Sequence, residues 1–201
     1  MSADLQPATD QRLLEIAAAH IRKFGAARTT IVGVAQEAGM SHANVYRYFA
    51  SRTGLLDAVT AHWLKPLELR LQNTAQGADP AYDKLERLLS DVARTYGDKL
   101  AADPNLFSLF ATAVDKSRSV ARKHRGRLQG EVQGVVEEGM GNGVFAITDQ
   151  KRAMALVFDM THRFIQPAAI LADAALPRPA MQARFDWVMR LLLRALRSGR
   201  V

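Results

Sequence analysis

The sequence of 201 residues contains no cysteine. This absence excludes disulfide bonds, zinc sites with cysteine ligands and catalytic thiols. Hydrophobic residues make up 48% of the chain, which is enough to bury a sizeable core. We therefore expect a globular protein that is stabilised by side-chain packing.

Long hydrophobic runs are also lacking. The most apolar stretches, residues 154–160 and 188–196, are interrupted by charged side chains, and neither approaches the ~20 residues that a membrane-spanning helix needs. The first eleven residues have neither the basic start nor the apolar stretch of a secretion signal. We therefore expect no membrane partner and a cytoplasmic location.

The formal net charge is +7, but its distribution matters more than its total. Up to residue 62 there are six basic and five acidic residues, so this part of the chain is nearly neutral. The excess of positive charge lies in residues 116–127 and 184–200. Net charge alone therefore does not indicate nucleic-acid binding.

Apolar residues recur at intervals of three and four along most of the chain, which predicts an all-α fold of about nine helices. Caps, glycines and prolines indicate their limits. The expected helices cover 10–24 (capped by Thr9), 31–38 (capped by Thr30), 42–49 (capped by Ser41), 52–76 (capped by Ser51 and kinked or broken at Pro66), two segments that begin at Asp79-Pro80 and Asp103-Pro104 with a capping carboxylate, about 118–138 (stopping at Gly139-Met140-Gly141-Asn142-Gly143), 148–167 and 179–198. We divide the chain into residues 1–50, a connecting helix over 51–76, and a larger helical domain over 77–201.

Residues 30–49 have the length of a helix, a tight turn and a second helix. In the second helix, Val45 and Phe49 point to the core, Ala43 and Arg47 face the opposite way, and polar or aromatic residues lie on the flanks. Such a surface suits the major groove of DNA, where an amide pairs with adenine and a guanidinium with guanine.

Three other interpretations fit the composition. The segment could be an ordinary helix pair whose tyrosines pack in a bundle, and the chain could then be a helical protein-interaction module or a helical enzyme that does not bind DNA. No nucleophile, base and orienting residue occur at a recognisable spacing. The five histidines show no pairing at three or four residues, so we expect neither a metal site nor a cofactor.

The segment from about residue 9 to 57 resembles the N-terminal domain of TetR-type repressors. The residues that carry the resemblance are Phe24-Gly25, Thr30, Val34-Ala35, Ala38-Gly39-Met40-Ser41, Val45-Tyr46-Arg47-Tyr48-Phe49, Ser51-Arg52 and Leu55-Leu56. The rest of the chain resembles the family in length and helix count only. Two positions depart from the family pattern: Arg52 replaces the usual lysine, and Gly54 often has an acidic counterpart.

The resemblance implies a small three-helix DNA-binding domain joined to a larger helical domain for effector binding and dimerisation. It implies a repressor that binds palindromic double-stranded operator DNA as a homodimer and is released by an unknown small-molecule effector. The residues expected near base edges are His42, Ala43, Asn44 and Arg47. Those expected at phosphates are Thr30, Tyr46, Tyr48 and Arg52.

The C-terminal part is expected to contain the dimer interface. The last two helices are expected to form the dimer interface, with apolar material from Leu191, Leu192, Leu193 and Leu196. An effector pocket is conceivable around Tyr96, Phe107, Phe110, Phe158, His162 and Arg163, although these residues could equally belong to the core or face a partner subunit. The basic cluster, residues 116–127, is expected to be a solvated helix face rather than a second nucleic-acid surface or a site for an acidic effector.

Overall fold

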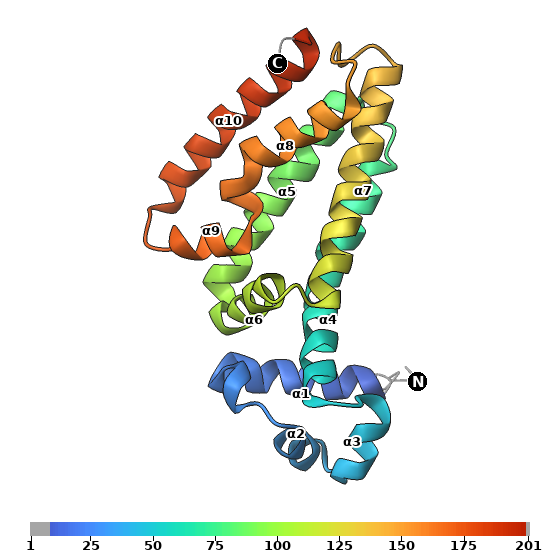
Figure 1. The fold of residues 1–201 in the computed structure, drawn as a ribbon. Coiled ribbons are helices and arrows are strands. Elements are labelled where there is room, and N and C mark those ends of the chain that lie inside the picture. The colour runs from blue at the N-terminus through green and yellow to red at the C-terminus, as the bar shows by residue number, and fades with distance from the viewer. Residues whose placement is uncertain (1–8, 200–201) are drawn as a thin grey trace, which may run out of the picture. The chain divides into compact units, whose positions relative to one another are not determined.

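The computed structural model describes residues 9–199. Within this range the chain forms ten α-helices and one short 3-10 helix, with no strand (Figure 1), so the all-α prediction is confirmed. The elements are α1 (Thr9–Phe24), η1 (Ala26–Arg28), α2 (Ile31–Ala38), α3 (His42–Tyr48), α4 (Arg52–Ala75), α5 (Ala81–Ala102), α6 (Pro104–Asp115), α7 (Ser119–Gly141), α8 (Gln150–Ile165), α9 (Pro167–Ala172) and α10 (Arg178–Ser198). None of the helices in the described range is long and apolar enough to span a membrane.

The contacts between residues divide the chain into two compact units. Unit 1 contains the chain up to Lys65 together with residues 101–122, and unit 2 contains residues 66–100 together with those from Lys123 onward. Helix α6 therefore belongs to the same unit as the N-terminal helices, although it lies in the second half of the chain. The expected divisions at residues 50 and 76 stay a prediction.

The core of unit 1 is formed by the apolar faces of α1, α2, α3 and the start of α4. Leu13 and Ile21 of α1, Val34 of α2, Val45 of α3 and Leu55 of α4 have no exposed surface. Helix α1 packs against both α2 and α6, and α2 packs against α3. The short helix α3 is thus anchored through a few buried side chains, which leaves its opposite face to solvent.

Asp103, at the start of α6, has a different role from the predicted helix cap. Its side chain makes no capping hydrogen bond. Instead, Oδ1 accepts a hydrogen bond from Nε of Arg22 in α1 at 2.7 Å, and Oδ2 accepts one from Nε1 of Trp63 in α4 at 3.3 Å. Asn105 also donates to the Arg22 carbonyl oxygen at 2.8 Å. The first turn of α6 is therefore tied to α1 and α4.

In unit 2, α8 packs against α9 and α10, as Figure 1 shows. Leu85 and Leu88 of α5, Val132 of α7 and Val157 of α8 are fully buried. Leu192, Leu193 and Leu196 of α10 are also buried within the protomer, at 0–1% exposure. The expectation that these three leucines supply the dimer interface is therefore wrong, because the protomer's own core already covers them.

Several helix limits differ from the predictions. Helix α4 continues through Pro66 without a break. Helix α7 ends at Gly141, within the predicted stop at residues 139–143, and the turn follows at Gly143, which has a φ of 70°. The region expected to form the last two helices contains three helices in the structure. Helix α8 ends at Ile165, and Pro167 begins the additional short helix α9. Proline is favoured at a first turn, where its missing N–H costs nothing.

Candidate nucleic-acid interface

Two helix caps and one glycine, all acting locally, define the helix-turn-helix formed by α2 and α3. Oγ1 of Thr30 accepts a hydrogen bond from the Gly33 N–H at 3.0 Å and caps α2. Gly39 ends α2 in the left-handed conformation, with a φ of 67°, which glycine adopts at little cost. Oγ of Ser41 then accepts from the Asn44 N–H at 3.3 Å and caps α3.

These caps orient α3 as the periodicity predicted. Val45 is fully buried and Phe49 is 8% exposed. On the other side, His42, Ala43 and Arg47 are exposed and Asn44 is half-buried. Tyr46 and Tyr48 are 53% and 45% exposed, so their rings do not belong to the protomer core. The face that was expected to read DNA is therefore free in the protomer, and the contacts themselves stay a prediction.

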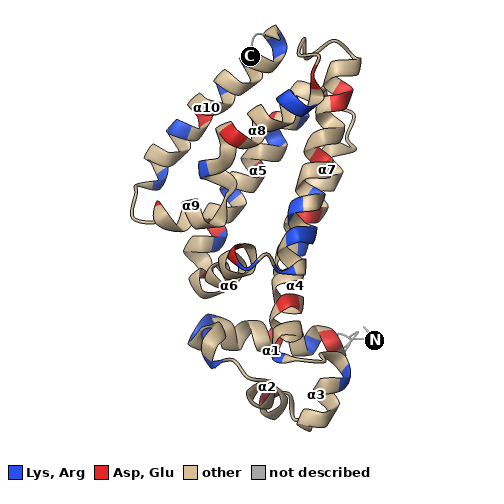
Figure 2. Cartoon of the chain, in the orientation of Figure 1, with Lys and Arg blue, Asp and Glu red and all other residues tan. Residues whose placement is uncertain are grey.

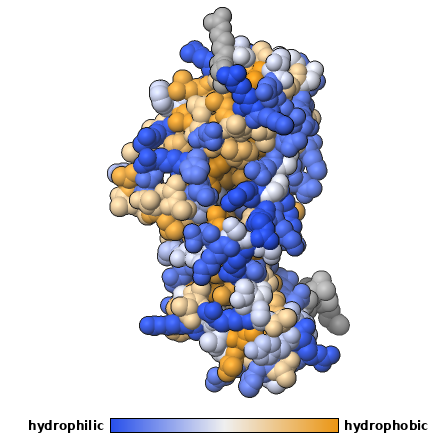
Figure 3. All heavy atoms as spheres, in the orientation of Figure 1, coloured by the Kyte–Doolittle hydropathy of each residue, from blue (hydrophilic) through white to orange (hydrophobic). Residues whose placement is uncertain are grey.

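The charge of this surface is modest. Figure 2 shows α2 and α3 mostly without charged residues, and Figure 3 shows hydrophilic and hydrophobic side chains interspersed on one face of the molecule. Arg47 is the basic residue of α3. The partial positive charge at the helix N-terminus adds to it, because the first backbone N–H groups of a helix lack partners within the helix.

Arg52 has internal partners that the sequence did not reveal. Its Nε donates to the Thr29 carbonyl oxygen at 2.8 Å, and Nη2 donates to the carbonyl oxygens of Ala26 and, at 3.2 Å, Ala27. The guanidinium thus holds η1 and the segment before α2 against the start of α4. A phosphate contact by Arg52 stays a prediction, but stabilisation of this segment is its visible role.

A second residue that sequence reasoning missed is His20. Its Nε2 pairs with Oε2 of Glu37, which links α1 to the last turn of α2. The imidazole also lies above Gly33, where an added Cβ would be 3.4 Å from Cε1. The pair fixes α2 on α1, and no local spacing in the sequence joins residues seventeen positions apart.

Two family models match the chain. Residues 13–59 match the model described as bacterial regulatory proteins, tetR family, and residues 81–189 match the tetracyclin repressor-like C-terminal domain. The chain belongs to the TetR family. TetR-family proteins are transcriptional regulators with a helix-turn-helix DNA-binding domain and a ligand-binding C-terminal domain.

Solved structures with the TetR fold support the same architecture. A protein of unknown function from Rhodococcus sp. RHA1 is 20% identical, with a TM-score of 0.71 and coverage of 98% of this chain and 99% of that one. The fatty acid degradation regulator FadR from Bacillus halodurans is 17% identical, with a TM-score of 0.69 and coverage of 94% and 96%. FadR from Bacillus subtilis, in complex with stearoyl-CoA, is 17% identical, with a TM-score of 0.65 and coverage of 95% and 99%. No curated protein matches the chain.

The six residues suggested for a TetR effector pocket have different surroundings. Phe107 and Phe110 lie in unit 1, where their rings meet that of Trp63 edge to face at 6.3 and 6.4 Å between centroids. Tyr96, Phe158, His162 and Arg163 lie in unit 2.

In unit 2, Tyr96 is buried, Phe158 is half-buried and His162 is exposed. Arg163 forms a bidentate ion pair with Asp173. Its Nε donates to Oδ2 at 2.6 Å, and its Nη2 donates to Oδ1 at 2.7 Å. An effector pocket formed by these residues stays a prediction.

Tyr96 takes part in a buried polar chain that the sequence did not indicate. Its hydroxyl lies 2.6 Å from Nε2 of His124, and Nδ1 of His124 lies 2.7 Å from Oε1 of Glu68. Nη1 of Arg127 donates to the other Glu68 oxygen at 2.6 Å. Tyr96 and His124 are only 2% and 4% exposed. An ionised carboxylate only accepts, so Nδ1 carries the proton in the bond to Glu68.

The hydrogen-bonded side chains around Glu68 influence one another's pKa values. Burial alone would raise the pKa of the Glu68 carboxyl, but the hydrogen bond to His124 and the positive charges of His124, when protonated, and Arg127 hold that pKa below its usual value. Burial raises the pKa of Tyr96, and the negative charge of Glu68 raises it further, so the phenol stays protonated at neutral pH.

The basic cluster of residues 116–127 is only partly the solvated face that its spacing predicted. Lys116, Lys123 and Arg125 are exposed. By contrast, Arg118 pairs with Asp57 at 2.5 Å, and Arg127 pairs with Glu68. Part of this charge is therefore neutralised inside the protomer. No group of three His, Cys, Asp or Glu residues in the described range is arranged to hold a metal ion.

Proposed function

We propose that this TetR-family regulator is a repressor that binds a palindromic operator as a homodimer and is released when a small organic molecule binds its C-terminal domain. The observation that carries the proposal is the free face of α3, which follows a capped helix-turn and presents exposed polar and aromatic side chains. A helical enzyme or an interaction module does not require such a face.

On this proposal, α3 enters the major groove. His42, Ala43, Asn44 and Arg47 approach base edges: the small side chain of Ala43 permits close approach, the Asn44 amide suits adenine, and the Arg47 guanidinium suits guanine. The hydroxyls of Thr30, Tyr46 and Tyr48 and the guanidinium of Arg52 contact phosphates and hold the protein in register.

Dimerisation through α8 and α10 completes the operator-binding form. These helices pack against each other, and Leu191 on the outer side of α10 is 37% exposed. Half-buried Phe158 and Val188 add apolar surface on α8 and α10. A two-fold dimer presents two copies of α3, so its operator has two inverted half-sites about one helical turn or a little more apart.

Release requires an effector that binds one conformation better than the other, because only differential affinity shifts the equilibrium. Structural relatives support an organic ligand: FadR from Bacillus subtilis was solved with stearoyl-CoA, and RolR, 19% identical with a TM-score of 0.61, was solved with resorcinol. As candidate effector contacts we propose Tyr96, Phe158, His162 and Arg163 in unit 2 and, separately, Phe107 and Phe110 in unit 1.

The decisive experiment is selection of bound fragments from random DNA by the purified protein, at a stated salt concentration, followed by sequencing. An enriched inverted repeat is the expected result. Absence of any enrichment at low salt, together with no salt-dependent shift of random fragments, would show that the chain does not act through DNA.

The reading role of α3 is tested by Asn44→Ala. The exchange should cost about 1–3 kcal/mol of operator affinity and relax the preference at one base pair of each half-site, because one base contact is lost. Affinity is measured by fluorescence anisotropy on operator variants. The control is Gln129→Ala, on an exposed position of α7, which should leave binding unchanged. Equal behaviour of the two variants would remove Asn44 from the interface.

A further inference from the structure

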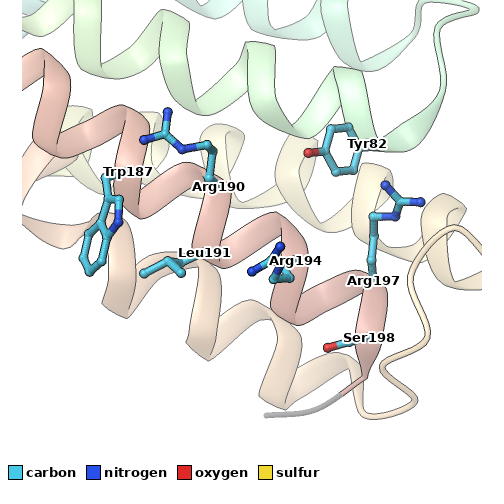
Figure 4. A pocket seen from close by; sticks show the side chains of 7 residues that line it. All are labelled: Tyr82, Trp187, Arg190, Leu191, Arg194, Arg197 and Ser198. Atoms are coloured by element: carbon cyan, nitrogen blue, oxygen red, sulfur yellow. The ribbon is translucent and has the colours of Figure 1, made fainter.

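A groove along α10 is lined by Tyr82 of α5 and by side chains of α10 that include Trp187 and Leu191 (Figure 4). It lies on the face that the proposed dimer covers, so on that proposal a second copy of the chain is its occupant. Unit 1 contains a polar contact to which the proposed function assigns no role. This contact joins His20 of α1 to Glu37 of α2.

The position of α3 depends on the helix before it. Within its seven residues, which the structure describes in full, α3 buries one side chain, that of Val45. Residues 39–41 connect it to α2, and the Met40 N–H donates to the Ala35 carbonyl oxygen at 2.9 Å, which ties this connection to α2. A rotation or shift of α2 is therefore passed on to α3.

The face of α2 that packs on α1 is apolar. Its buried residues are Ile31, Val34, Ala35 and Ala38. Hydrophobic burial is non-directional, whereas a hydrogen bond has a preferred length and angle. A hydrogen bond beside this face therefore restrains the rotation of α2 about its own axis.

His20 supplies such a hydrogen bond. Its Nε2 pairs with Oε2 of Glu37 in the last turn of α2, two residues before Gly39 ends the helix. The His20 side chain is only 18% exposed, and its ring meets that of Phe24 edge to face, with 5.7 Å between the centroids. The imidazole is thus held by α1, and it holds the end of α2 that leads to α3.

Gly33 makes room for this imidazole. A Cβ on Gly33 would lie 3.4 Å from Cε1 and 3.8 Å from Nδ1 of His20. Glycine is unfavourable in a helix interior, and the φ of Gly33 is not positive, so no turn requires a glycine here. Gly33 and Glu37 lie one turn apart on the same side of α2. The imidazole spans both positions.

We propose that His20 is a positioning residue for operator recognition: by bonding Glu37 across Gly33, it holds α2 in the rotation that presents the base-reading side chains of α3. This inference rests on the proposed operator binding. Loss of the pair lowers the preference for operator over random DNA, because base contacts need a defined geometry and electrostatic attraction to phosphates does not. A purely structural role would lower stability and leave the affinity of folded molecules unchanged.

The test compares variants of the full-length protein on the selected operator and on random DNA of equal length, by fluorescence anisotropy. His20→Leu keeps a side chain of similar size but removes the hydrogen bond, and Glu37→Ala removes its partner. His20→Gln keeps an N–H donor and is the conservative variant. Ala19→Leu, at the neighbouring exposed position of α1, is the control. Circular dichroism and urea unfolding establish a temperature at which every variant is folded.

We expect His20→Leu and Glu37→Ala each to weaken operator binding about threefold to tenfold, as the loss of one hydrogen bond would. The double variant should be no weaker than either single variant, because both remove the same interaction. Affinity for random DNA should stay nearly constant in all of them. His20→Gln should recover most of the lost operator affinity, and Ala19→Leu should bind like the natural protein.

Unchanged operator affinity in a folded His20→Leu protein would show that the pair is merely structural. Equal losses on operator and random DNA would point to a change of charge and would also overturn the proposal, as would additive losses in the double variant. A natural protein that prefers no sequence would overturn the proposed function itself, and this inference with it. That result is visible before any variant is made, so the two failures are distinguishable.

Discussion

At the scale of single residues, Arg52 has two candidate roles, one in DNA binding and one in the stability of the fold. As a phosphate ligand it acts on DNA, and as a donor to the carbonyl oxygens of Ala26, Ala27 and Thr29 it acts on the fold. The two roles make different predictions, because a phosphate contact changes the salt dependence of binding and an internal hydrogen bond changes stability.

We expect Arg52→Ala to lower the free energy of unfolding by about 1–2 kcal/mol, since the carbonyl oxygens lose charge-assisted donors. If Arg52 also contacts phosphate, the variant should weaken binding to all DNA sequences alike and reduce the salt slope by about one unit. Urea unfolding and salt-dependent anisotropy separate the effects, with Arg28→Ala, an exposed position in η1, as the control. A stability loss with an unchanged slope would make Arg52 purely structural.

Glu68 carries a second prediction at this scale. Its pKa is lowered in the folded state, so its contribution to stability is present above its unfolded pKa and is lost as the pH falls through the folded value. Glu68→Gln should therefore destabilise the protein by about 1–3 kcal/mol at pH 7. The difference from the natural protein should shrink below about pH 4.5, where the unfolded carboxyl takes up its proton.

Urea unfolding at a series of pH values measures this difference. The matched control is Glu86→Gln, on an exposed position of α5. A gap between Glu68→Gln and the natural protein that stays constant down to pH 3 would show that the charge of Glu68 contributes nothing.

At the scale of elements, the end of α7 depends on the absence of a side chain at one position. A Cβ on Gly139 would overlap the ring of Phe145, which is buried at 2% exposure. Gly130 lies in the same helix, and a Cβ there would meet no atom within 4 Å. The same exchange therefore has opposite consequences at the two positions.

Gly139→Ala should lower the free energy of unfolding by about 1–3 kcal/mol through overpacking. Gly130→Ala should raise the free energy of unfolding by up to about 1 kcal/mol, because alanine is more stable than glycine at an exposed helix position. Thermal and urea unfolding provide the measurement. If both variants were stabilised, the close approach of Phe145 to α7 would not exist in solution.

At the scale of the whole molecule, the proposed dimer couples assembly to operator binding. Leu191→Glu places a charge on the proposed interface, where its burial would be costly. We expect a monomer by light scattering at micromolar concentration and an operator affinity reduced at least about tenfold, because a half-site contact alone remains.

The control is Leu176→Glu, another exposed leucine, at 44% exposure, in the turn before α10. It should preserve both the dimer and operator binding. Circular dichroism establishes that each variant is folded. A Leu191→Glu protein that stays dimeric would place the interface elsewhere.

The helix-turn-helix could be predicted from the sequence because the residues that define it lie close together in the chain. Thr30 caps α2 and Ser41 caps α3, each by accepting a hydrogen bond from the N–H group three residues further on. Gly39 adopts the left-handed backbone conformation that ends α2. The inward face of α3 follows from helical periodicity alone. For the same reason the all-α class and most helix starts could be predicted, whereas the short α9 could not.

The sequence by itself thus determined the helical class, the helix-turn-helix and the free face of α3, since each depends on residues within a turn or two of one another. Only the tertiary structure decided the partners of side chains that are distant in sequence. Asp103 meets Arg22 across 81 positions, and Glu68 meets His124 across 56. Periodicity reports which side of a helix is apolar, but hydrogen bonds between helices depend on packing that no local pattern encodes.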